Sequence, residues 1–131
     1  MIPTWIDLST KNKDFIYEVS NCMKKKHLGQ ENAAKLGELL EELFGLSERG
    51  VKDAAYYNSG RVLRKAFETI NQEYGGMVVS DTERGYWYAS SLNDGLDAVE
   101  KNRSRARKIL ENAHQVEANI LSAYGGQMGL I

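Results

Sequence analysis

The stretch RVLRKAFETINQEYGGMVVSDTERGYWYA, residues 61–89, decides the fold of this chain. Its first half carries apolar residues at the three- and four-residue spacing of a helix, and two glycines then stop the pattern. Two runs rich in β-branched and aromatic residues follow, at 77–80 and 86–89, and the polar loop 81–85 joins them. The stretch therefore predicts a helix over 61–74 and a β-hairpin directly after it.

Two further helices are predicted upstream of this stretch. Residues 13–26 place apolar side chains at helical spacing and end in three lysines, which suit the negative end of a helix dipole. Residues 32–44 place four leucines in one stripe, with Asn32 as the N-cap and Gly45 as the stop. Ser47 could cap a short helix that covers 51–56, and Asn58-Ser59-Gly60 is turn-like, so Ser59 is expected to cap the helix at 61.

The last element is a helix over about 94–124 with an interrupted apolar stripe. A helix of about thirty residues is roughly 45 Å long, which exceeds what a core of this size covers. Part of it is therefore expected to pack against a second copy of the chain. The expected dimerisation residues share the stripe: Leu96, Val99, Leu110, Ala113 and Ile120. We expect a domain over 1–92, followed by a helix and short tail over 93–131.

Length and composition set limits on the class of protein. A chain of 131 residues builds one modest core, and its ordinary apolar and charged fractions argue against disorder. The start of the chain does not resemble a signal peptide, and no apolar run approaches the roughly 20 residues that cross a bilayer. We therefore expect a cytoplasmic protein with no membrane contact. The net charge of −1 hides a basic run over 101–108.

Motifs for catalysis, nucleotides and metals are missing from the sequence. No glycine-rich phosphate loop is present, and no residue is marked as an activated nucleophile. Cys22 is the single cysteine, so the chain forms no internal disulfide. Cys22 and His27 are five residues apart, share a helical face poorly and lie beside lysines that repel a cation. We predict a protein that is not an enzyme and has no catalytic residue, no cofactor and no metal ligand.

The pattern of charge and structure favours a DNA-binding protein. Basic residues occupy the first turns of the helix at 61, and a helix can enter the major groove with its N-terminal residues nearest the bases. Ser59 and neighbouring amides could grip a phosphate there, and a loop arginine could reach a minor groove or a phosphate. The expected DNA-binding residues are Ser59, Arg61, Arg64, Lys65, Arg84 and Tyr86. The alternative is that these are solvated charges, and acidic neighbours such as Glu68 and Glu83 favour it.

Four segments resemble a family of small phage and prophage winged-helix proteins. They are Gly85-Tyr86-Trp87-Tyr88, then Ser91-Leu92-Asn93-Asp94, then the basic run at 103–110, and residues 36–49 resemble the family's second helix and turn. The resemblance covers about residues 31–112. It implies a winged helix-turn-helix core, double-stranded DNA as the partner, and a role in transcription or replication. A protein–protein adaptor or replication-loader subunit is the alternative, because winged helices also serve as such modules.

One departure from the family leaves two starts open for the recognition helix. In the family this helix follows the Ser-Glu-Arg turn directly, whereas residues 50–58 intervene here. A start at Ser47 would bring Arg49 and Lys52 to the DNA. A start at Ser59 is favoured, because the helix after it has the cleaner amphipathic pattern and leads straight into the hairpin.

Overall fold

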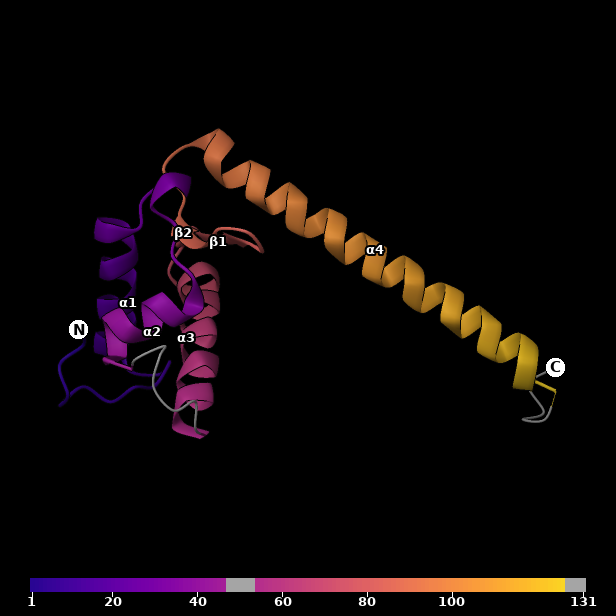
Figure 1. Ribbon diagram of the computed structural model, residues 1–131, viewed down its shortest axis with the longest axis horizontal. Coiled ribbons are helices and arrows are strands. Elements are labelled where there is room, and N and C mark those ends of the chain that lie inside the picture. The colour runs from indigo at the N-terminus through magenta and orange to yellow at the C-terminus, as the bar shows by residue number, and fades with distance from the viewer. Residues whose placement is uncertain (47–53, 127–131) are drawn as a thin grey trace. The chain divides into compact units, whose positions relative to one another are not determined.

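The computed structural model describes residues 1–46 and 54–126. Its elements, in chain order, are α1 (Lys13–Lys26), a 3₁₀ turn (Gln30–Asn32), α2 (Leu36–Phe44), α3 (Ala54–Glu73), β1 (Val78–Asp81), β2 (Gly85–Tyr88) and α4 (Leu92–Tyr124) (Figure 1). The fold is mainly helical with one antiparallel hairpin, which confirms the α+β prediction. Contacts divide the chain into two units, Met1–Ala98 and Val99–Ile131.

Helix α1 has the bounds that the sequence predicts. The Asn12 side chain accepts a hydrogen bond from the backbone N–H of Asp14 at 3.1 Å and so caps its first turn. Its apolar stripe is buried, with Phe15 and Val19 fully inaccessible to solvent. The lysines in its last turn stay in solvent, where they complement the helix dipole.

Helix α2 begins at Leu36, so the predicted N-cap at Asn32 is wrong. Residues just before it are extended, and Ala34 pairs with Tyr86 through two backbone hydrogen bonds of 2.9 and 2.8 Å. Asn32 instead belongs to the 3₁₀ turn, and its side chain donates to the carbonyl of Leu28 at 2.7 Å. A pairing partner distant in sequence therefore overrides the local helical pattern here.

Helix α3 runs without interruption through Asn58, Ser59 and Gly60, so the predicted turn is wrong. The predicted short helix at 51–56 is instead the start of α3 where the structure describes it; residues 51–53 lie outside the described part. Gly60 is buried against α2, where an added Cβ would lie 3.5 Å from Leu36 Cδ2. Burial of this face stabilises the helix across residues that alone favour a turn.

Strand β2 lies at the centre of a small pairing network. Val78 pairs with Tyr88 and Asp81 pairs with Gly85 along its β1 edge, so three residues form the loop and each strand is one residue from its predicted position. On its other edge Tyr88 donates to the carbonyl of His27 at 2.7 Å, beside the Ala34 pair. Both edges of β2 thus have partners, which removes the exposed edge that a lone hairpin would leave.

Aspartate 94 fixes the beginning of α4 to the hairpin. Its carboxylate accepts from Trp87 Nε1 at 3.1 Å and from the N–H of Ser90 at 3.0 Å, and its other oxygen accepts from the N–H of Gln30 at 3.1 Å. Its own N–H donates to the hydroxyl of Ser91 at 3.2 Å, the capping pattern of a helix start. The helix therefore begins at Leu92 rather than at 94.

Replacing Gly60 with alanine tests whether α3 is continuous. The added Cβ would make only ordinary contact with Leu36, and alanine favours a helix by about 1 kcal/mol over glycine. We expect Gly60→Ala to raise the free energy of unfolding by about 1 kcal/mol, measured by urea denaturation. Destabilisation would indicate a turn at this position.

The matched control for that substitution is Gly85→Ala in the hairpin. Gly85 has φ of 98°, and its Cβ would lie 2.3 Å from the carbonyl oxygen of Ala34. This variant should lose stability in the same assay, because the left-handed backbone and the clash both oppose a side chain.

Candidate nucleic-acid interface

The exposed face of α3 is the candidate interface. Its opposite face is committed to the core, where Leu63 and Ile70 are almost completely buried. Its exposed polar and aromatic side chains over residues 57–65 are Tyr57, Asn58, Arg61, Arg64 and Lys65. Their spacing of three and four residues places them along one side of the helix. We call this set the α3 face.

The α3 face carries positive charge without a neighbouring acid inside it. Residues 54–67 contain no aspartate or glutamate, and the first acidic residue along the helix is Glu68. Lys65 Nζ lies 3.9 Å from Glu68 Oε2, a solvent-exposed pair that is worth little. Within the part of the chain that the structure describes, Arg61 and Arg64 form no ion pair, so both can meet an anion.

The structure places the other predicted contact residues differently. Ser59 is half-buried in an early turn of α3, so it does not cap that helix. The predicted phosphate grip by Ser59 at a helix N-terminus is therefore wrong. Arg49 and Lys52, and the alternative helix start at Ser47, lie outside the described residues.

Arg84 is held inside the hairpin. Its guanidinium Nη1 lies 2.9 Å from Asp81 Oδ2, and its backbone N–H donates to the other carboxylate oxygen at 2.5 Å. With the amide of Gln30 turned so that its oxygen faces the guanidinium, Arg84 Nε donates to it at 2.7 Å. Burial raises the pKa of Asp81, but the bonds from Arg84 outweigh it and hold that pKa below its usual value.

Tyr86 is mainly a packing residue. Its ring centroid lies 4.9 Å from that of Phe67, and its backbone pairs with Ala34.

Lys35 brings a positive charge to the hairpin loop that no local sequence pattern indicates. Its ammonium donates to the carbonyls of Glu83 and, at 3.4 Å, Thr82. Contacts between residues so far apart in sequence leave no local pattern.

Helix α4 exposes the stripe expected to dimerise. Leu96 is 55 % exposed, Leu110 57 % and Ile120 50 %; Ala113 is also exposed and Val99 is half-buried. At a spacing of seven residues, positions 99, 106, 113 and 120 are all apolar, whereas Arg103 and Glu117 interrupt the parallel row at 96, 103, 110, 117 and 124. Such a repeat is typical of helices that pack along one seam.

Three ligand-type side chains meet where the sequence predicts that they do not. The sequence argument that Cys22 and His27 do not share a helical face assumes that the helix continues through His27. His27 is instead the residue at which α1 ends, with φ of −127° and ψ of 40°. Its ring thereby reaches Glu42 of α2, with Nε2 at 2.9 Å from Oε2. Burial raises the pKa of Cys22 to about 12, and its hydrogen bond to Glu42 adds to the effect. Burial opposes ionisation of Glu42, yet hydrogen bonds from both residues lower its pKa.

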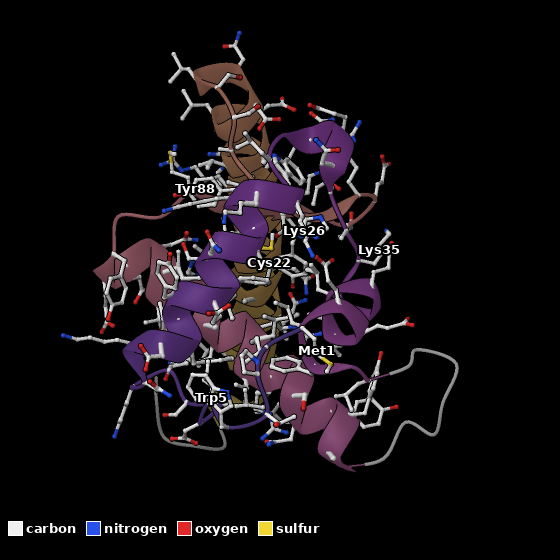
Figure 2. The ribbon with its side chains drawn as sticks, turned by 90° about the vertical axis from the view of Figure 1, so that its left-hand side faces the viewer. Met1, Trp5, Cys22, Lys26, Lys35 and Tyr88 are labelled. Carbon is white, nitrogen blue, oxygen red and sulfur yellow. The ribbon has the colours of Figure 1, made fainter. Side chains whose placement is uncertain are left out.

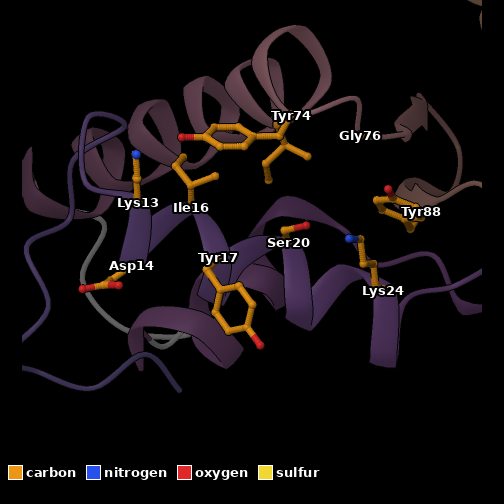
Figure 3. A pocket seen from close by; sticks show the side chains of 10 residues that line it. Lys13, Asp14, Ile16, Tyr17, Ser20, Lys24, Tyr74, Gly76 and Tyr88 are labelled. Carbon is orange, nitrogen blue, oxygen red and sulfur yellow. The ribbon is translucent and has the colours of Figure 1, made fainter.

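A cleft of about 460 Å³ lies between α1, the end of α3 and β2. Figure 3 shows Tyr17, Tyr74 and Tyr88 around it, together with Lys24. Lys24 Nζ lies 5.6 Å from the ring centroid of Tyr88, a cation–π distance. Its one acidic lining residue is Asp14, and the described lining residues include no histidine or cysteine that could act with it in catalysis.

Comparison with known proteins gives no match to a family model, to a curated protein or to a solved structure. Among the described residues, none of the helices combines the length and apolarity needed to span a bilayer. The candidate interface therefore rests on the geometry of this chain alone.

Replacing Asp81 with asparagine tests the hairpin's charged anchor. Because the folded pKa of Asp81 is depressed, its carboxylate stabilises the fold above its unfolded pKa of about 3.9, and that stability is lost as pH falls through the folded value. We expect Asp81→Asn to cost about 2 kcal/mol at pH 7, a difference that shrinks below about pH 4. Denaturant unfolding across this range measures it.

Glu83→Gln is the control, because it changes an exposed acid in the same loop. It should leave stability nearly unchanged at both pH values. A pH-independent loss in Asp81→Asn would show that its charge does not anchor the turn.

Proposed function

We propose that this protein binds double-stranded DNA through the α3 face. The observation that carries the proposal is the α3 face itself, an exposed row of aromatic, amide and basic side chains over residues 57–65, a stretch of the helix without an acidic residue. A single α-helix fits the major groove of B-form DNA. Its partner is thus a polyanion that offers both phosphates and base edges.

The order of elements supports a winged helix-turn-helix core. A short extended segment at Ala34 separates α1 from α2 and pairs with β2, and α3 leads into the hairpin. In this arrangement α3 is the recognition helix and the loop 82–84 is the wing. Lys35, fixed on the loop carbonyls, adds positive charge to that wing.

The side chains of the α3 face match the chemistry of direct readout. Arg61 and Arg64 can each donate two hydrogen bonds to guanine, and Asn58 can pair with adenine in the same groove. Lys65 suits a phosphate contact, which positions the helix without selecting a sequence. Arg84 and Tyr86 act behind them, because their contacts with Asp81 and Phe67 hold the hairpin in shape.

A second copy of the chain is the proposed partner of the α4 stripe. Two copies joined there would present two α3 faces, as a repeated DNA half-site requires. Together with the resemblance to phage and prophage regulators, this favours a cytoplasmic regulator of transcription or replication rather than an enzyme. The run at 101–108 adds positive charge that phosphates can meet.

An adaptor or replication-loader subunit is the second candidate function. The acids around the α3 face favour it, since Glu68 and Glu73 lie further along the helix and Glu83 lies in the loop. A face of mixed charge suits a protein partner as well as DNA.

Fluorescence anisotropy with a mixed-sequence duplex across a salt series tests the DNA proposal. Arg61→Ala combined with Arg64→Ala should weaken binding about 10-fold at low salt, because two cationic side chains that contact the duplex are lost. Lys11→Ala with Lys13→Ala removes the same charge from exposed positions on another segment and should have little effect.

Equal losses in both double variants would contradict a contact through the α3 face. A folded protein that does not bind the duplex at low salt would exclude the DNA proposal and leave the adaptor, to be sought by a pull-down of partner proteins.

Light scattering on the protein as it elutes from a size-exclusion column measures its molecular mass and so tests the dimer. The wild type should have twice the mass of one chain, and Leu110→Glu with Ile120→Glu should give single chains because charge is placed in the seam. Asn112→Glu with Gln115→Glu adds the same charge outside the stripe and should stay dimeric. A wild type that is monomeric at high concentration would contradict the seam.

A further inference from the structure

A cluster of three side chains at the end of α1 stands apart from the α3 face. Cys22 Sγ lies 3.1 Å from Glu42 Oε1, and His27 Nε2 lies 2.9 Å from Glu42 Oε2. One donor atom from each residue lies within 4.8 Å of the other two. Cys22 is part-buried, and the His27 side chain is only 12 % exposed. Figure 2 shows Cys22 and the neighbouring Lys26 along α1.

The orientation of the His27 ring points to a cation in this cluster. Its Nδ1 lies 2.8 Å from the carbonyl oxygen of Asn32, which can only accept, so Nδ1 carries a hydrogen. Its Nε2 faces a carboxylate, which is also an acceptor. In the neutral ring two lone pairs would then face each other, so this position favours a positive charge, and a metal ion fits there once the two atoms move from 2.9 Å to about 3.3 Å apart. A carbonyl behind a histidine is also the usual support of a metal-bound imidazole.

We propose that Cys22, His27 and Glu42 bind one Zn²⁺ ion. Thiolate, imidazole and carboxylate are the ligands that Zn²⁺ takes in proteins, at bond lengths of about 2.0–2.3 Å. Around a tetrahedral ion such bonds place the ligand atoms about 3.3 to 3.8 Å apart. The distances from Glu42 to Cys22 Sγ and to His27 Nε2, 3.1 and 2.9 Å, are shorter than that range, and all three ligand atoms lie within 4.8 Å of one another, so small side-chain rotations would open the cluster around an ion.

The surroundings provide a fourth position and the charge balance. A cavity of about 140 Å³ is lined by Cys22 and Glu42, with Glu18 also on its wall, and it can hold the water that completes the tetrahedron. Thiolate and carboxylate together neutralise the ion. Binding releases the Cys22 thiol proton, and any proton on His27 Nε2, to solvent, as Zn–S and Zn–N bonds replace the S–H and N–H bonds.

Two lysines oppose this site: Lys25 lines the same cavity, and Lys26 contacts Glu42 directly. The Lys26 ammonium lies 3.5 Å from Glu42 Oε1, but its side chain is 63 % exposed and can turn into solvent. An exposed pair of this kind is worth little, whereas a zinc ion gains three protein ligands. The ion would join the end of α1 to α2, the helix on which α3 packs.

Titration of the metal-free protein with Co²⁺ tests the site directly. Cys22 is the only cysteine, so a thiolate-to-cobalt charge-transfer band can come from no other residue. We expect the band to saturate at one ion per chain and to disappear when Zn²⁺ is added in equal amount. Thermal unfolding should occur at a higher temperature with Zn²⁺ than without it.

Variants separate a three-ligand site from a lone thiol. Cys22→Ser should abolish the band, while His27→Gln and Glu42→Gln should lower the affinity for Co²⁺ at least 10-fold. His114→Ala removes the other histidine and Glu41→Gln the adjacent acid, and both should bind as the wild type does. Circular dichroism confirms that each variant is folded.

Two results would overturn the proposal. One is a folded wild type with no thiolate band at a Co²⁺ excess and mildly alkaline pH. The other is a band that His27→Gln and Glu42→Gln leave unchanged. Neither result bears on DNA binding, which the α3-face variants test separately.

Discussion

Backbone pairing on both edges of β2 is the constraint on which the rest of the structure depends. One edge pairs with β1, and the other pairs with Ala34 and with the turn after α1. These bonds end the extended segment at Lys35 and so set where α2 starts. Because α2 and α3 pack together, the same pairing sets which side of α3 is buried. Gly85 permits this pairing, since a Cβ there would meet the carbonyl of Ala34.

The proposed DNA contact depends on the side of α3 that this packing leaves exposed. Leu63, Phe67 and Ile70 are buried in the core, so the side chains on the opposite side of α3 are not needed for packing. Among the described residues, Arg61 and Arg64 have no acidic partner of the kind that holds Arg84 in the hairpin. A rigid helix with unpaired guanidinium groups is pre-organised for an anion, because the groups need no rearrangement before contact. The proposed zinc site is separate from the α3 face, and an ion bound there would link the end of α1 to α2.

Sequence periodicity predicted much of the fold, but not its exceptions. The bounds of α1 and the presence of the hairpin follow from local patterns, as do Arg61, Arg64 and Lys65 on an exposed face. The start of α2 and the helical state of Gly60 depend on partners distant in sequence. The same holds for Lys35 at the hairpin loop and for Glu42 beside His27. The role of Asp94, by contrast, has a local signal, because Ser91-x-x-Asp94 is the spacing of a capped helix start.

The central claim is that the α3 face contacts DNA, and an NMR titration with a short duplex tests it most directly. The account predicts that the largest shifts fall on Tyr57, Asn58, Lys65 and the Nε–H groups of Arg61 and Arg64. Shifts in the loop 82–84 should be smaller, and the buried face of α3 should change little. Shifts confined to α4 would contradict the account, as would the absence of any change at low salt.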